Sequence, residues 1–232
     1  MRCGRACTRR SASISAAADR NRSRWRSSRS CTPGVIVAAE HAAVVLAAGL
    51  SRRLGRPKQL LCRDGVSLLR HALDAVLATA PLRVVAVLPA DAPAIEREID
   101  GLPVERCFNP AAQTGIAGSL QLAAAALAGH AGPTLIVGVD QIHLRPAHLV
   151  ALLAADPDGD VVSGYGAAFG LPVRVGAATL RRAAELSGDA GFRSLWSRSG
   201  VLPRRIEAAE LAFDLDTPDT LAAAVAAGWI DR

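Results

Sequence analysis

AAVVLAAGLSRRLGRPKQLL, residues 42–61, is the stretch that decides the fold. Its opening run, 42–49, is apolar without interruption and ends in glycine, which is typical of a parallel strand buried on both faces. The following residues include Gly55 and several arginines, so they form a loop rather than a continuation of the strand. A buried strand that leads into such a loop predicts an α/β domain whose ligand binds at the carboxyl end of the strand.

The chain on either side of this stretch alternates apolar runs with helical patterns, as repeated strand-helix-strand units require. Ser67 is expected to be the N-cap of the first helix and Asp91 the N-cap of the second. We therefore predict an α/β fold, a Rossmann-like three-layer sandwich with a mostly parallel central sheet in a single domain. The expected strands are 42–49, 82–88, 104–108, 134–139, 160–165, 170–175 and 201–207, and the expected helices are 67–78, 91–99, 115–128, 146–155, one ending at 186, a short element at 192–196 and a closing helix at 218–227.

The positive charge of the chain is concentrated in its first 34 residues. Of 27 Lys and Arg, nine Arg fall in residues 1–34 beside a single acid, Asp19, so the remainder carries 18 basic and 20 acidic side chains. This composition predicts a disordered Arg/Ser-rich leader over 1–34 and one folded domain over 35–232. Because the charge is not on the folded part and aromatic residues make up only 3% of the chain, we expect no nucleic-acid partner. Apolar runs are too short to span a membrane, and five cysteines without a CxxC pair favour a reducing, cytoplasmic setting.

The loop after the first strand has the composition of a polyphosphate-binding site. Gly49 and Gly55 let backbone amides approach an oxyanion, and the cations Arg52, Arg53, Arg56 and Lys58 gather on the same short segment. Lys58 is the only lysine in the chain. The spacing G-x5-G-x2-K matches neither the dinucleotide fingerprint nor a Walker A loop. A nucleoside triphosphate is the polyanion that this loop fits best.

The loop A-A-G-x-S-x-R-x-G-x-x-K-x-L, residues 47–60, resembles the signature loop of the MobA/MocA-like nucleotidyltransferases. Four further segments are similar to motifs of that family and occur in the same order. They are NPAAQTGIAGSLQLA (109–123), GVDQIHLRPAHL (138–149), GDAGFRSL (188–195) and FDLDTPDTL (213–221). The resemblance covers about residues 42–228 and implies an enzyme that transfers a nucleotide to molybdopterin or to a related phosphorylated acceptor.

The resemblance also implies a set of site residues. Catalytic roles fall to Lys58, Arg52 and Asp140, and a divalent cation, Mg²⁺, to Asp140 and Asp216, with Asp214 as a weaker rival. Either carboxylate has a structural alternative: Asp140 could cap the helix that begins at Pro146, and Asp216 could cap the last helix. The residues expected to bind the nucleotide are Leu46, Ala47, Ala48, Gly49, Ser51, Arg53, Gly55, Asn109, Gly118 and Ser119.

The implied reaction is attack by an acceptor phosphate on the α-phosphorus of the triphosphate, with release of pyrophosphate. A phosphate monoester is already ionised at neutral pH, so no general base is required. In the family, alanine at the position of Ala48 goes with CTP and glycine with GTP, so we expect CTP. Departures from the family pattern at Ile142, Leu171 and Phe192 fall on the acceptor side. His143 and Arg145 could compensate by contacting the acceptor phosphate, and Asp189 with Arg193 could position the acceptor.

Three interpretations of function follow from these residues. The first is a Mg²⁺-dependent cytidylyltransferase acting on molybdopterin, whose product could pass to a molybdenum hydroxylase as partner. The second keeps the chemistry with another phosphorylated small molecule as acceptor, or with GTP as donor. The third is a non-catalytic nucleotide- or cofactor-binding chaperone.

Overall fold

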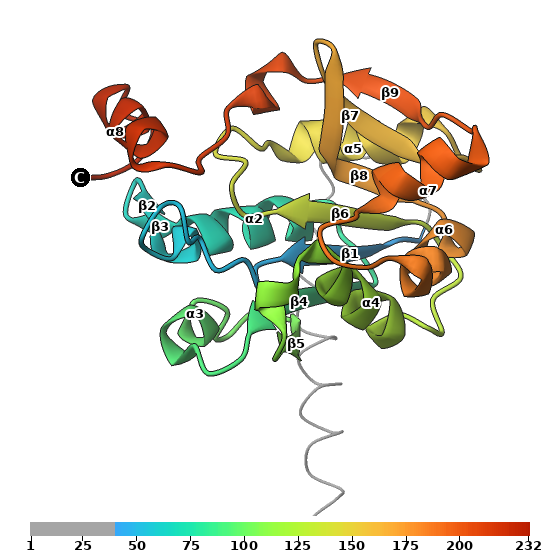
Figure 1. Ribbon diagram of the computed structural model, residues 1–232, viewed down its shortest axis with the longest axis horizontal. Helices are drawn as coiled ribbons and strands as arrows, with labels where there is room; N and C mark the ends of the chain where they lie inside the picture. The colour runs from blue at the N-terminus through green and yellow to red at the C-terminus, as the bar shows by residue number, and fades with distance from the viewer. Residues whose placement is uncertain (1–39) are drawn as a thin grey trace, which may run out of the picture. The chain divides into compact units, whose positions relative to one another are not determined.

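The computed structural model describes residues 40–232 (Figure 1), so the predicted leader, 1–34, lies outside the described residues. The central sheet has seven strands in the order β5-β4-β1-β6-β8-β7-β9. Every strand of this sheet except β8 runs in the same direction, because β8 is antiparallel to both β6 and β7. The strands are β1 (Ala42–Leu46), β4 (Arg83–Pro89), β5 (Glu105–Asn109), β6 (Thr134–Gly138), β7 (Val161–Tyr165), β8 (Ala168–Val175) and β9 (Arg204–Glu207).

The apolar runs of the sequence are continuous because both faces of the sheet are buried. In β1, Ala43 and Val45 pack into one core, whereas Ala42 and Val44 pack into a second core on the opposite face. The same alternation holds along β4 and β6, since successive strand residues point to opposite faces. The sheet is therefore the middle layer of a three-layer sandwich, as predicted.

Helices cover both faces of the sheet (Figure 1). The first core is closed by α2 (Leu68–Leu77), α3 (Pro93–Arg97) and α5 (Pro146–Ala155). The second core is closed by α4 (Ile116–Ala126), α6 (Ala177–Arg181) and α7 (Phe192–Ser199). Short 3-10 helices occur at η1 (Lys58–Leu60), η2 (Ala112–Thr114), η3 (Arg182–Glu185) and η4 (Ala209–Ala212).

A third apolar cluster joins the C-terminal segment to the residues that follow the glycine loop. The cluster includes Leu54, Leu61 and Leu68 from the first part of the domain and Leu215 and Leu221 from the last. It holds α8 (Pro218–Ala226) against the small hairpin of β2 (Cys62–Arg63) and β3 (Val66–Ser67), as Figure 1 shows. The C-terminal segment therefore packs beside the predicted nucleotide loop.

The predicted elements are confirmed with four differences. The strand expected at 201–207 is shorter, since Val201 and Leu202 are exposed and pairing with β7 begins at Arg204. Ser67 accepts the hydrogen bond of an N-cap from the amide of Arg70, as expected. Asp91 is not an N-cap: it has a φ of 56°, and the helix begins after Ala92 without a capping side chain.

The other two differences concern segments where periodicity is a weak guide. The helix expected to end at 186 divides into α6 and η3. The β2–β3 hairpin was not predicted, because each of its strands has only two residues and so shows no period. Within the described part of the chain, no helix combines the length and hydropathy needed to cross a bilayer.

Candidate active site

The predicted site residues gather around a cavity at the carboxyl edge of the parallel strands. β1 and β6 are neighbours and end at Leu46 and Gly138, so the loops that follow them meet at this edge. The cavity between these loops and the start of α4 has a volume of about 540 Å³, within the usual range for a small-molecule site. The predicted residues that line it are Leu46, Ala48, Gly49, Ser51, Arg52, Arg53, Lys58, Ser119, Asp140 and Asp216.

Four residues expected to bind the nucleotide do not line the cavity: Ala47, Gly55, Asn109 and Gly118. Asn109 is buried and supports the wall from behind, since its Oδ1 accepts from the amide of Ala111 at 2.9 Å and its Nδ2 donates to Ser119 Oγ at 3.0 Å. Gly55 completes a turn, with a φ of 77° and its amide bonded to the carbonyl of Ser51. Asn109 and Gly55 therefore shape the wall of the cavity without lining it.

Lys58 lies at the centre of the site between two carboxylates. Its Nζ donates to Asp216 Oδ1 at 2.6 Å and to Asp140 Oδ2 at 3.2 Å, and its side chain is only 11% exposed. Burial alone would lower the pKa of Lys58, but the charges and hydrogen bonds of the two carboxylates raise it above its ordinary value. Lys58 is therefore a permanent positive charge held at the strand edge.

The turn before Lys58 is organised by Ser51. Its backbone has a φ of 49°, and its carbonyl accepts from the amides of Leu54 and Gly55. Its hydroxyl accepts from the amide of Lys58 at 3.1 Å. Ser51 thus fixes the turn through its carbonyl and the backbone of Lys58 through its hydroxyl. These two contacts account for the small polar residue at this position.

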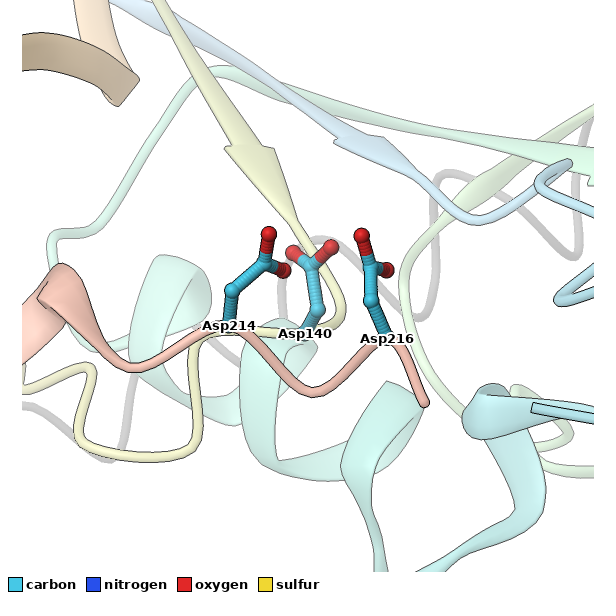
Figure 2. A group of neighbouring side chains, drawn as sticks. All are labelled: Asp140, Asp214 and Asp216. Atoms are coloured by element: carbon cyan, nitrogen blue, oxygen red, sulfur yellow. The ribbon is translucent and has the colours of Figure 1, made fainter. Parts of the chain in front are cut away.

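Asp140, Asp214 and Asp216 point toward one another (Figure 2). One carboxylate oxygen from each lies within 4.8 Å of the others. Burial, with the neighbouring charges of Asp216 and Asp140, raises the pKa of Asp214. Burial also acts to raise the pKa of Asp216, but the hydrogen bond and charge of Lys58 and the charge of Arg53 bring it below its ordinary value. Lys58 and Arg53 therefore stabilise the charged form of Asp216, whereas the charged form of Asp214 is disfavoured.

Neither structural alternative for these carboxylates describes the structure. The N-cap of α8 is Thr217, which forms a capping box with Thr220, while Asp216 turns to Lys58 and Arg53. The helix that follows Asp140 in the chain, α5, begins directly after Arg145, and no side chain caps it. The site is thus where both carboxylates make their side-chain contacts.

The donor set of this cluster fits a divalent cation. Three carboxylates supply hard oxygen ligands, which Mg²⁺ and Mn²⁺ prefer over nitrogen or sulfur. Asp214, the weaker rival in the sequence, also has a carboxylate oxygen within 4.8 Å of the other two. Asp140, Asp214 and Asp216 are therefore the residues that could hold a metal.

The far wall of the cavity joins the start of α4 to the segment after η3. Gly115 has a φ of 108°, and a Cβ there would lie 2.3 Å from the carbonyl oxygen of Gly188. That carbonyl accepts from the amide of Ala117 at 3.1 Å, and Gln121 Nε2 donates to the carbonyl of Leu186 at 2.8 Å. These contacts fix Asp189 in the cavity wall.

The departures from the family pattern are not equivalent in space. Ile142 and Phe192 are each 5% exposed, pack in apolar clusters and do not line the cavity. Leu171, in the middle of the antiparallel strand β8, lines the cavity. Of the three departures, only the one at Leu171 therefore alters the cavity wall.

Two of the residues suggested for the acceptor, His143 and Arg193, have other partners. The rings of His143 and Trp229 are 4.6 Å apart, and burial with the charge of Arg63 lowers the pKa of His143. Arg193 stacks on the ring of Phe169 at 4.3 Å and donates to its carbonyl at 3.0 Å. His143, Arg145 and Arg193 do not line the cavity.

Sequence reasoning missed residues whose roles depend on distant partners. Gln59, which is completely buried, lines the cavity together with Gln113 and Ile116. A glutamine beside Lys58 carries no motif signal of its own. Its burial could have been suspected only from the apolar residues around it.

A parallel sheet, a glycine loop at its carboxyl edge and a lysine between carboxylates together define a phosphate-binding α/β domain. Residues 43–203 match the model of the MobA-like NTP transferase domain. The chain belongs to this family, as the resemblance of its motifs predicted, and so carries a nucleotidyltransferase domain.

Individual relatives agree with this assignment. The bifunctional protein GlmU of Dinoroseobacter shibae is 36% identical over 149 residues, which are 60% of this chain and 33% of that protein. This chain therefore spans about a third of the length of that curated relative. The structure of Rv0371c from Mycobacterium tuberculosis H37Rv superposes with a TM-score of 0.71 at 26% identity, covering 82% of this chain and 99% of that one. The inositol-1-phosphate CTP transferase of T. maritima, with a TM-score of 0.64 at 16% identity over 83% and 95% of the two chains, shares the fold.

Proposed function

We propose that the protein is a metal-dependent nucleotidyltransferase that moves a nucleotidyl group, CMP from CTP, onto a phosphorylated acceptor. The observation that carries the proposal is the position of Lys58. Its ammonium group lies between Asp140 and Asp216 in the wall of a cavity bordered by a glycine loop. The charge that develops during phosphoryl transfer is stabilised by cations, and this site places a lysine next to a cluster of carboxylates that could hold a metal ion.

The chemistry follows from the charges at the site. An oxygen of the acceptor phosphate forms a bond to the α-phosphorus, and the bond from that phosphorus to the bridging oxygen breaks. Pyrophosphate leaves with this oxygen and its electron pair. Lys58 neutralises charge that develops on the α-phosphate and the leaving group, and Arg52, which is exposed on the cavity wall, supports the β- and γ-phosphates.

Asp140, Asp216 and Asp214 would hold the divalent cation, which when bound supplies further neutralisation of phosphate charge. Mg²⁺ is the proposed ion because phosphates and carboxylates suit it. The name of one structure of Rv0371c describes a complex with manganese, which supports a divalent cation in a protein of the same fold.

The base of the nucleotide is proposed to lie against Ala48 and Ser119. Ala48 is 2% exposed and lines the cavity, so its methyl group limits the room for a ring at that point. Ser119 accepts from Asn109, which leaves its own hydroxyl proton to donate to a base or ribose. This arrangement supports a pyrimidine, and CTP is the proposed donor over GTP.

Molybdopterin is the proposed acceptor, because the order of motifs resembles that of the family members that use it. A different phosphorylated small molecule is the second candidate, and Leu171 is the observation that favours it. An apolar side chain stands at the part of the cavity wall where the sequence departs from the family pattern. A molybdenum hydroxylase as recipient of the product and a cytoplasmic setting are parts of the first proposal.

The test is release of pyrophosphate from each nucleoside triphosphate with each acceptor, followed by the mass of the product. CTP with molybdopterin and Mg²⁺ should give pyrophosphate and a cytidylylated product, and GTP should give at least tenfold less. Turnover with another phosphorylated acceptor alone would replace the first candidate by the second. Nucleotide binding without pyrophosphate release from any pair would overturn the enzyme and support a chaperone.

A further inference from the structure

Gln59 is a buried polar residue at the base of the glycine loop. It lies in η1 directly after Lys58 and has no exposed surface. Its Nε2 donates to the carbonyl oxygen of Ala47 at 2.6 Å and to that of Gly49 at 2.7 Å. Both amide protons are therefore used to bind the backbone at the start of the loop.

The carbonyl of Ala47 needs this donor because the sheet cannot supply one. Ala47 donates its own amide to the carbonyl of Val87 in β4. Continuing the register in which Leu46 pairs with Val87, the next amide of β4 to reach the carbonyl of Ala47 would belong to Pro89. Proline has no N–H, so a buried carbonyl would be left without a partner.

The orientation of the carboxamide follows from its surroundings. Two carbonyl oxygens face it, and only the nitrogen of the carboxamide can donate to them. The Oε1 of Gln59 consequently has no hydrogen-bond partner among the residues that the structure describes. An unpaired buried oxygen is unfavourable, so the two contacts with the loop must outweigh it.

These contacts determine where the loop amides point. In a trans peptide the N–H is opposite to the C=O of the same plane. With the carbonyls of Ala47 and Gly49 turned to Gln59, the N–H groups of Ala48 and Leu50 face away from it. Ala48, Gly49 and Leu50 all line the cavity. Within residues 40–232, no backbone N–H from Ala48 to Arg53 donates to a protein acceptor.

We propose that Gln59 is a positioning residue for the polyphosphate of the substrate. It holds the carbonyls of Ala47 and Gly49 inward, so that the amides of Ala48 and Leu50 are aimed at phosphate oxygens before the nucleotide arrives. Preorganised N–H donors bind an anion without the cost of reorienting the backbone. The inference rests on the proposed function, since it takes the polyphosphate of a nucleotide as the ligand of this loop.

The variant that tests it is Gln59→Met, which keeps the length of the side chain and removes both donors. The measurement is calorimetric titration of the full chain with tripolyphosphate, which has the anion and no base or sugar. The dissociation constant should rise about tenfold or more in Gln59→Met. Leu152→Val is the matched control: it removes a methylene from the buried face of α5, away from the cavity, and should lower the melting temperature without changing tripolyphosphate binding.

A second measurement uses the unmodified protein and so does not depend on the folding of a variant. In ¹⁵N–¹H spectra of the wild-type protein, tripolyphosphate should move the amide protons of Ala48 and Leu50 downfield. Wild-type protein that does not bind tripolyphosphate would overturn the proposed function of the loop together with this inference. Wild-type binding with an unchanged constant in Gln59→Met, or with no shift at Ala48 and Leu50, would overturn the role of Gln59 alone.

Discussion

Gly115→Ala should break the contact that joins the two sides of the cavity wall. Gly115 has φ 108° and ψ −178°, a backbone conformation that residues with a Cβ rarely adopt. The added Cβ would lie 2.3 Å from the carbonyl oxygen of Gly188, 2.4 Å from its carbon and 2.5 Å from Asp189 Oδ1. Two of these neighbours are backbone atoms, which cannot rotate away as the end of a side chain can.

The magnitude follows from two losses. Forcing this conformation on alanine costs about 1–3 kcal/mol, and losing the hydrogen bond from Ala117 to Gly188 costs about 1 kcal/mol more. The free energy of unfolding should therefore fall by about 2–4 kcal/mol, which for a domain of this size corresponds to a fall in melting temperature of roughly 4–16 °C. Nucleotide affinity should fall as well, because Gly115 and Asp189 both line the cavity.

The matched control is Gly118→Ala, three residues further along the same segment. Gly118 lies inside α4, and a Cβ there would meet nothing nearer than Asn109 Nδ2 at 3.6 Å, an ordinary contact. Because alanine is the better helix former, this variant should be unchanged or more stable by up to about 1 kcal/mol.

Urea denaturation of the two variants and the wild type, followed by circular dichroism, gives the three free energies. The reasoning is refuted if Gly115→Ala unfolds within about 0.5 kcal/mol of the wild type, well inside the range of ordinary surface substitutions. It is equally refuted if Gly118→Ala is destabilised as much as Gly115→Ala, because the helix would then be sensitive to any added methyl group.

Three further predictions concern other parts of the domain. Lys58→Met should lower kcat by about 10² or more in the pyrophosphate-release assay, since the charge on the leaving group loses its cation; turnover at the wild-type rate would contradict this role. Asp231→Ala removes the acceptor of the amides of Asp64 and Gly65, 3.0 and 2.8 Å away, and should cost about 1 kcal/mol in urea denaturation; an unchanged midpoint would show that the hairpin does not need it. Burial holds the pKa of His148 below its ordinary 6.5, so the unfolded chain takes up a proton that the native domain does not, and the free energy of unfolding should fall as the pH drops below 6.5. His148→Gln should show a smaller fall over the same range, and an identical pH dependence would contradict the assignment.

Local patterns in the sequence were sufficient for most of the fold. The strand β1 is apolar at every position, and β4 and β6 are apolar after their first residues, Arg83 and Thr134, because both faces of these strands are buried. They could therefore be recognised without knowledge of their neighbours. The N-cap at Ser67 could be recognised for a similar reason, since its partner is the amide of Arg70, three residues away. Asp91 shows the limit of such local rules, because its positive φ places it in a turn that ends before the helix begins.

Some residues of the cavity wall could be predicted from the sequence, and the roles of others could not. The family motif identified Lys58, Asp140 and the glycine loop, and the structure brings them to one cavity. The motif did not separate residues that face the cavity from residues that support it, and so it grouped Asn109 with Ser119. Only burial and the direction of each side chain distinguish these two roles, because both residues belong to one short segment.

What the sequence by itself determined is the class of domain, the order of its elements and the loop that carries the lysine, because each is written in residues close together in the chain. What only the tertiary structure decided are contacts across the fold. The bonds from Lys58 to Asp216 and from Ala117 to Gly188, and the inclusion of Asp214 in the carboxylate cluster, all join distant segments. The order of strands in the sheet and the packing of the C-terminal segment bring these atoms together, and both depend on the burial of apolar surface over the whole domain rather than on any local pattern.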